Sequence, residues 1–122
     1  MKTPDDRMYA KSHEWVKIQG NKALIGITDY AQHAMGDIVF VNLPEEGDEF
    51  NIGDAFSDIE SVKAVSEAYC PLKGRITRVN TDLEDSPELI NSAPYDTWLV
   101  EAEFQSLDNL MSADEYDALD KE

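Results

Sequence analysis

The chain is short and strongly acidic. It has 122 residues and a formal net charge of −16, from 26 aspartates and glutamates against 10 lysines and arginines. This length predicts one domain over residues 1–122, with a modest core. A surface of this charge repels nucleic acid and anionic membranes, so we expect neither as a partner. No apolar run approaches the roughly 20 residues that a membrane-spanning helix needs.

Both the N-terminus and the cysteine content bear on the compartment. Residues 1–6 contain no apolar stretch of a secretory signal and are too acidic for a typical transit peptide. Cys70 is the only cysteine, which excludes an internal disulfide and fits a reducing compartment. We therefore expect a soluble, cytoplasmic protein.

The first half of the chain predicts short strands. Residues 15–18 and 23–27 are expected to pair through a turn at 19–22. Residues 38–43 form the most apolar and β-branched run, which predicts a core strand. Closely spaced turn signals then leave room for only a very short strand at 49–50. Many short strands with frequent turns indicate a barrel or a sandwich.

One short helix is expected between the second and third of these strands. Thr28 or Asp29 can cap a helix over residues 30–35, and Gly36 is placed to end it.

The second half predicts two more strands and a helix. Residues 75–80 alternate between polar and apolar, as a half-buried strand does. Ser86 is expected to cap a helix whose first position is Pro87. From Trp98 to Phe104, alternate residues share one apolar face of a further strand.

Different structures are predicted for the two ends of the chain. Residues 1–8 are expected to be a loosely ordered N-terminal segment, and residues 106–122 a C-terminal helical extension. A capping box at 112–115 opens the helix of that extension. Its Tyr116 and Leu119 are placed to pack back on the core.

Lys63 is the residue with the most unusual setting. It is the only basic residue between Lys22 and Lys73. Acidic residues lie on both sides of it, at Asp58, Glu60 and Glu67.

The segments around Lys63 predict a hairpin. Two β-compatible runs flank residues 61–64, and turn signals at 51–54 and 70–74 close those runs. Lys63 is then expected at the hairpin tip, where a side chain projects away from the body.

A lysine at such a tip has two interpretations. An exposed lysine on a turn commonly serves only solubility. Alternatively its amine is chemically modified, because an enzyme or a partner's cleft can reach a hairpin tip. Val62, Ala64 and Val65 make the tip apolar for so acidic a chain, and such a surface suits docking.

The residues around Lys63 resemble a known motif. The sequence Glu-Ser-Val-Lys-Ala at 60–64, followed by a Pro-x-x-Gly segment at 71–74, is similar to the lipoyl-lysine motif of the glycine cleavage system H-protein family. Other lipoyl domains typically have an aspartate directly before the lysine, and biotin carriers have methionines on both sides. Val62 and Ala64 favour the H-protein family over both.

The resemblance extends over roughly residues 9–119. Several separate motifs in the same order are far more specific than one. Ala34 stands where some family members have a histidine, with His33 beside it. The matching segments are residues 12–16, 26–32, 36–41, 43–44, 84–91, and 94–95 before Trp98.

The resemblance implies a fold and a cofactor. The fold is a mainly β, lipoyl/biotinyl-type hammerhead, a flattened β-barrel or sandwich with short added helices. Lipoate is implied in amide linkage on Lys63, and the chemistry would be that of the cofactor.

Four partner proteins are implied by the same family. A pyridoxal-phosphate glycine decarboxylase loads an aminomethyl group, a folate-dependent aminomethyltransferase takes its methylene group, and a flavin dihydrolipoyl dehydrogenase reoxidises the dithiol. A lipoate-attaching enzyme installs the cofactor, and the carrier is expected to be monomeric when free.

Further site residues follow from the resemblance. Ser12, Glu14 and Glu67 match positions suited to hold the loaded arm, because carboxylates hydrogen-bond a cationic amine with charge assistance. Glu60 matches the surface recognised by the lipoate-attaching enzyme. The alternative is that these carboxylates are solvated charges and Ser12 is a turn residue.

Other functions remain open at this stage. The chain could serve as a lipoyl donor or relay, or as a lipoyl domain of a 2-oxo acid dehydrogenase. It could also be an acidic, non-catalytic interaction module. Enzymatic activity is not indicated, because His13 and His33 have no metal-binding spacing and no Gly-rich phosphate loop is present.

Overall fold

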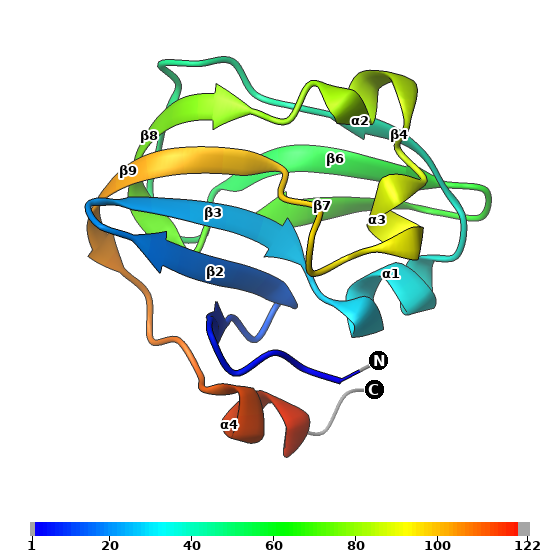
Figure 1. The fold of residues 1–122 in the computed structure, drawn as a ribbon. Helices are drawn as coiled ribbons and strands as arrows, with labels where there is room; N and C mark the ends of the chain where they lie inside the picture. The colour runs from blue at the N-terminus through cyan, green and yellow to red at the C-terminus, as the bar shows by residue number, and fades with distance from the viewer. Residues whose placement is uncertain (1, 120–122) are drawn as a thin grey trace.

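The computed structural model describes residues 2–119. Within this range the chain forms nine strands and four short helices (Figure 1). The strands make two antiparallel sheets that remain separate. The expected hammerhead is therefore present in its sandwich form and not as a closed barrel. Met1 and residues 120–122, which belong to the two expected terminal segments, lie outside the described residues.

The larger sheet has six strands. Hairpin pairing joins the first two long strands, and the last strand inserts beside them, so segments far apart in sequence become neighbours. In spatial order these strands are β1 (Met8–Tyr9), β2 (Glu14–Gln19), β3 (Lys22–Ile27), β9 (Val100–Leu107), β8 (Leu72–Val79) and β5 (Glu49–Phe50).

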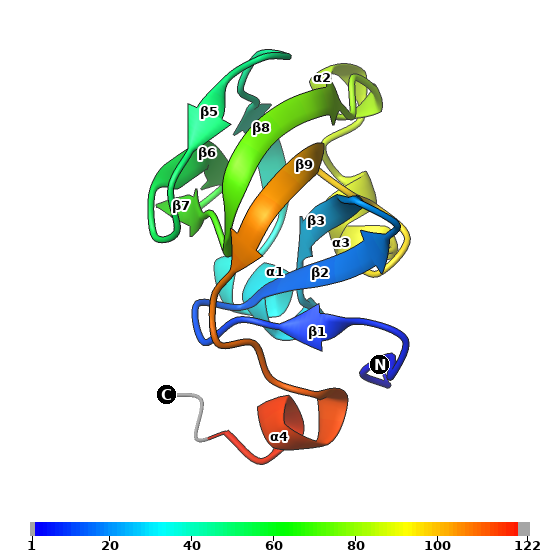
Figure 2. The same ribbon diagram turned by 90° about the vertical axis from the view of Figure 1, so that its left-hand side faces the viewer.

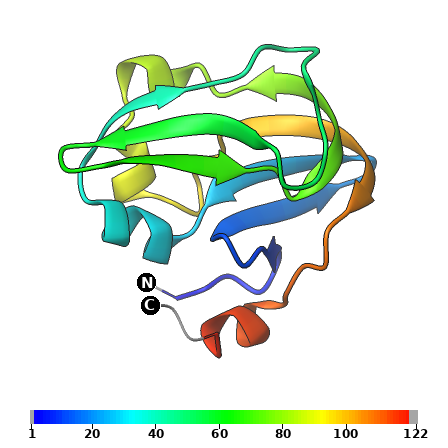
Figure 3. The same cartoon turned by 180° about the vertical axis from the view of Figure 1, so that it is seen from behind.

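The smaller sheet has three strands and lies in front of the larger one when the molecule is seen from behind (Figure 3). Its central strand pairs with both neighbours, and each edge strand pairs on one side only. In spatial order these strands are β4 (Ile38–Asn42), β6 (Ala55–Ser61) and β7 (Val65–Tyr69).

Four short helices complete the fold. The first begins where the sequence predicts, because the side chain of Thr28 caps it and Gly36 follows its end with a φ of 83°. The capping box of the last helix is also confirmed. The helices are α1 (Asp29–Met35), α2 (Asp82–Asp85), α3 (Leu89–Ser92) and α4 (Ala113–Asp117).

Apolar residues gather in two clusters. The main cluster takes side chains from both sheets, including Val16, Ile25, Ile59 and Leu72. The second cluster contains Tyr9, Trp15, Ala113 and Tyr116, with Leu119 packed against it. It attaches α4 to β1 and β2 at the lower end of the molecule (Figure 2). The expected inward packing of Tyr116 and Leu119 is confirmed.

The expected turn at 70–74 is shorter than predicted. β8 already begins at Leu72, so Gly74 lies inside a strand. A Cβ at Gly74 would collide with the main-chain carbonyl oxygen of Glu103 on β9. The glycine therefore permits a close approach of two strands and does not serve a turn.

The predicted helix after Ser86 is also displaced. α3 starts at Leu89, its N-cap is Glu88, and no side chain caps it. An additional helix, α2, precedes it and was not predicted. The strand expected from Trp98 begins instead at Val100. These boundaries shift because tertiary packing and not local sequence decides where these short elements begin.

Candidate functional site

The β6–β7 hairpin extends beyond the rest of the molecule (Figures 1 and 3). The last residues paired between the two strands are Glu60 and Val65, and Ser61 N–H donates to the carbonyl of Ala64 at 2.8 Å. The hydroxyl of Ser61 accepts from the backbone N–H of Lys63 at 3.3 Å and of Ala64 at 3.1 Å. The turn is thus held by its own serine, and Lys63 is exposed at its tip.

The tip also contacts the loop between α1 and β4. Val62 N–H donates to the carbonyl of Asp37 at 3.0 Å. The stem of Lys63 lies over Gly36, where an added Cβ would stand 3.4 Å from the Lys63 Cε. Gly36 therefore has two structural reasons to be glycine, its positive φ and the passage of the lysine stem.

The outer face of the small sheet carries apolar and acidic side chains near the tip. Phe40, Glu60 and Val65 stand opposite one another across the three strands. Val62 is 69% exposed and Val65 is 65% exposed. Lone apolar residues on a surface need no explanation, but several around one projecting amine indicate a contact surface.

A small pocket lies between α1 and β7. Figure 1 shows α1 on the same side of the molecule as the hairpin tip. The volume of the pocket is about 150 Å³. We call it the α1–β7 pocket, and it has three sides: the turn before β2, one face of α1, and the edge of β7. Its lining residues are Ser12, His13, Glu14, Ile27, Tyr30, Ala31, Ala34, Met35, Ile59, Ser66, Glu67 and Ala68.

Glu14 is the buried carboxyl group of this pocket. Its side chain is only 2% exposed. One oxygen accepts from the hydroxyl of Ser12, and the other accepts from the backbone N–H of Tyr69 at 3.2 Å. Burial raises the pKa of Glu14, and these hydrogen bonds oppose the rise. A cation that enters the pocket would therefore meet a carboxylate with little water around it.

The structure places the predicted residues in two groups. Ser12, Glu14 and Glu67 come together in the α1–β7 pocket. Lys63 and Glu60 lie on the hairpin, outside the pocket lining. The helix face of the pocket was not predicted, although Tyr30, Ala31, Ala34 and Met35 follow the spacing of one side of a helix.

Comparisons with known proteins show the family of this chain. The sequence model of the family described as Glycine cleavage H-protein matches residues 7–122. The chain is 54% identical over 120 residues to the glycine cleavage system H protein of Staphylococcus epidermidis and 52% identical to that of Staphylococcus haemolyticus, with 95% of each chain covered. The chain belongs to the glycine cleavage H-protein family.

A solved structure shows the same fold. The crystal structure of the glycine cleavage system H protein from Mycobacterium marinum superimposes with a TM-score of 0.88 at 38% identity, and covers 93% of this chain and 94% of its own. H proteins are the lipoyl carriers of the glycine cleavage system. This family member is therefore a carrier protein and not an enzyme.

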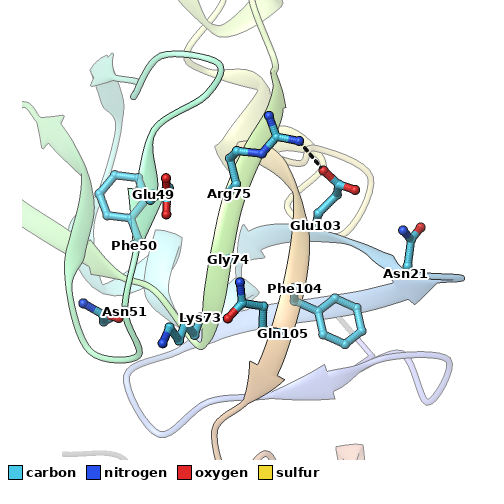
Figure 4. A pocket seen from close by; sticks show the side chains of 10 residues that line it. All are labelled: Asn21, Glu49, Phe50, Asn51, Lys73, Gly74, Arg75, Glu103, Phe104 and Gln105. Atoms are coloured by element: carbon cyan, nitrogen blue, oxygen red, sulfur yellow. Dashed lines mark hydrogen bonds and ion pairs between the residues drawn. The ribbon is translucent and has the colours of Figure 1, made fainter.

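A larger depression lies elsewhere on this H-family member, over β5, β8 and β9 (Figure 4). Its volume is about 470 Å³, and none of the predicted site residues lines it. Arg75 and Glu103 pair across it at 2.5 Å. The depression is polar, and two of its four charged side chains, Arg75 and Glu103, pair with each other. Because none of the predicted site residues lines it, the smaller α1–β7 pocket is the better candidate for the carrier function.

No helix within residues 2–119 has the length and apolarity needed to cross a membrane. In the same part of the chain, no three His, Cys, Asp or Glu side chains are grouped to hold a metal ion.

Proposed function

We propose that Lys63 carries the lipoyl group of this carrier, in amide linkage through its Nζ. The observation that carries the proposal is the position of Lys63, exposed on the tip of a hairpin that extends beyond the body (Figure 3). Gly36 leaves room for the lysine stem. When bound, lipoate supplies a disulfide that accepts an aminomethyl group and electrons.

The α1–β7 pocket is proposed to hold the loaded arm between visits to enzymes. The aminomethyl group carries a cationic amine. In the pocket, Glu14 offers a buried carboxylate, Glu67 an exposed carboxylate and Ser12 a hydroxyl. Hydrogen bonds between a cation and a carboxylate are roughly twice as strong as neutral ones. The apolar side of the pocket, formed by α1, suits the hydrocarbon part of the arm.

The hairpin is proposed to dock on four enzymes in turn. They are a lipoate-attaching enzyme, a pyridoxal-phosphate glycine decarboxylase, a folate-dependent aminomethyltransferase and a dihydrolipoyl dehydrogenase. Support comes from the apolar groups around Lys63, with Glu60 between Phe40 and Val65 in one row of the sheet. Glu60 is the residue proposed for recognition by the lipoate-attaching enzyme.

The attachment site is tested by intact mass. The chain is incubated with a lipoate-attaching enzyme, ATP and free lipoate, beside Lys63→Arg and the control Lys73→Arg, which changes an exposed lysine of β8. Arginine keeps the charge but removes the amine that must be acylated. One lipoyl mass is expected on the unchanged chain and on Lys73→Arg, and none on Lys63→Arg. Added mass on Lys63→Arg, or none on any of them, would overturn the proposal.

A further inference from the structure

One side chain of the C-terminal helix lies behind the wall of the α1–β7 pocket and contacts His13, which lines it. α4 lies below β1 in Figure 2, yet its Tyr116 is only 2% exposed. The Tyr116 hydroxyl lies 2.7 Å from His13 Nδ1 and 2.8 Å from Thr28 Oγ1. A phenol oxygen both donates and accepts, so one hydroxyl can serve both partners.

These two partners belong to different sides of the pocket. His13 lines the pocket between Ser12 and Glu14. Thr28 caps α1, and its hydroxyl accepts from the backbone N–H of Ala31, which lines the opposite side. The hydroxyl of Tyr116 therefore connects the turn that carries Glu14 to the first turn of α1.

The turn at His13 needs such support. His13 has a φ of 77°, the only positive φ of a non-glycine residue within the described range. This conformation is costly for a side chain with a Cβ and persists where the surroundings hold it. The ring of His13 also lies 4.7 Å from the ring of Tyr30 and 5.7 Å from that of Tyr116.

The phenol of Tyr116 stays protonated under ordinary conditions. Burial raises the pKa of Tyr116 above its usual value. Its ring also stacks on Tyr9 of β1, with centroids 5.0 Å apart and planes within 19°. The hydroxyl is thus a neutral group held in place by a packed ring.

We propose that Tyr116 is a positioning residue of the α1–β7 pocket, whose hydroxyl sets the spacing between the His13 turn and α1 and so determines how firmly the loaded arm is retained. This inference rests on the proposed function of the pocket. It gives the C-terminal helix a role in cargo retention in addition to its contribution to stability.

The test compares two tyrosine variants. Tyr116→Phe removes the hydroxyl and keeps the ring. Tyr9→Phe is the matched control, because Tyr9 is buried in the same stack and its hydroxyl donates to the carbonyl of Pro4, away from the pocket. Both variants and the unchanged chain are first lipoylated, which intact mass confirms, and then reduced to the dithiol.

The reduced arm is loaded with formaldehyde and ammonium. These condense with loss of water to an imine, and one thiol adds across its C=N bond, so the sulfur–carbon bond forms and the nitrogen gains the thiol proton. After the free reagents are removed, intact mass follows the loss of the aminomethyl group. We expect Tyr116→Phe to lose it about fivefold faster than the unchanged chain, because the contacts of the hydroxyl with His13 and Thr28 are both removed. Tyr9→Phe should match the unchanged chain within twofold.

A double variant separates positioning from general destabilisation. In a Glu14→Gln background the pocket has lost its buried carboxylate, so the additional effect of Tyr116→Phe on the rate of loss should disappear. Equal rates for Tyr116→Phe and the unchanged chain would overturn this inference alone. The inference would also be overturned if Tyr9→Phe and Tyr116→Phe accelerated the loss of the aminomethyl group equally, or if the effects of Glu14→Gln and Tyr116→Phe on that rate were additive.

Failure of the proposed function has a different signature. A chain that takes up no lipoyl mass contradicts Lys63 attachment before any loading. If Glu14→Gln retains the aminomethyl group as long as the unchanged chain, the pocket does not hold the arm, and the inference about Tyr116 is overturned with it.

Discussion

At the scale of single residues, Glu14 is the most informative group. Its burial raises its pKa, so Glu14 binds a proton more readily in the folded chain than in the unfolded chain. The contribution of Glu14 to the free energy of unfolding is therefore fully present below the pKa of the unfolded chain, and it is lost as the pH rises through the raised folded pKa. A cation bound in the pocket lowers the pKa of Glu14 again, because it favours the ionised carboxylate.

This linkage predicts how retention of the loaded arm depends on pH. The lifetime of the aminomethyl group on the reduced arm should lengthen as the pH rises through the raised pKa of Glu14. At a pH above the raised pKa of Glu14, Glu14→Gln should shorten the lifetime about tenfold, and the variant should lose this pH dependence. Lifetimes are measured by intact mass across a pH series.

The control for this prediction is Glu49→Gln, which changes an exposed glutamate of β5 outside the pocket. Glu67, His13 and Tyr30 also line the pocket, so the variant and not the pH profile alone identifies the titrating group. An unchanged pH profile in Glu14→Gln would contradict the prediction.

A second residue-scale prediction concerns Gly26. It pairs with Trp15 across β2 and β3, and an added Cβ would stand 2.7 Å from the Trp15 Nε1. The indole cannot easily move, because Nε1–H donates to the carbonyl of Pro94 at 3.0 Å. Gly26→Ala should lower the free energy of unfolding by about 1–3 kcal/mol in urea titrations.

The control is to make Gly26→Ala in a Trp15→Phe background, where the ring beside the glycine is smaller. The cost of the alanine should fall to less than half there, since phenylalanine leaves space beside the glycine. Equal costs in the two backgrounds would show that the collision with the indole is not the cause.

At the scale of elements, local signals predicted more than distant ones could. α1 was predicted with its ends because Thr28 and Gly36 mark them within the sequence itself. The role of Gly74 was mispredicted because the carbonyl it accommodates belongs to Glu103, on another strand.

The site shows the same limit. The position of Lys63 at a hairpin tip followed from its neighbours in sequence, and the hairpin is confirmed. Ser12, Glu14 and Glu67 were grouped only through the family resemblance. The contact between His13 and Tyr116 joins residues 103 positions apart, and no local pattern indicates it.

The hairpin itself yields an element-scale prediction. Ser61 accepts from the backbone N–H groups of Lys63 and Ala64, which fixes the presentation of the lysine. Ser61→Ala should lower the kcat/KM of lipoylation about threefold, because a looser tip must be ordered on binding. The thermal midpoint should change little, since the freed N–H groups are exposed to water.

Ser106→Ala is the matched control for the hairpin prediction, because Ser106 is an exposed serine on β9 in the other sheet. Lipoylation of that variant should proceed at the unchanged rate. An equal loss in both variants, or a large drop in the thermal midpoint of Ser61→Ala, would contradict the proposed role of the turn.

At the scale of the whole molecule, charge is the dominant feature. The excess of acidic over basic residues is 26 − 10 = 16, and it exceeds what internal pairing can neutralise. Two of the pairs that do form lie on the large sheet, where Arg75 and Arg78 of β8 contact Glu103 and Glu101 of β9. An exposed pair such as Arg75 with Glu103 contributes at most about 1 kcal/mol. Glu101 is buried, but its partner Arg78 is exposed to solvent, so the self-repulsion of the remaining carboxylates should outweigh these pairs.

This balance predicts that salt stabilises the fold. Between about 20 mM and about 500 mM NaCl, the free energy of unfolding in urea should rise by about 1 kcal/mol, because screening weakens repulsion among exposed carboxylates. Screening saturates once the Debye length is only a few ångströms. A rise that instead continued linearly beyond about 1 M would indicate exclusion of salt from the surface. A decrease with salt would show that ion pairs such as Arg78 with Glu101 contribute more than the net repulsion does.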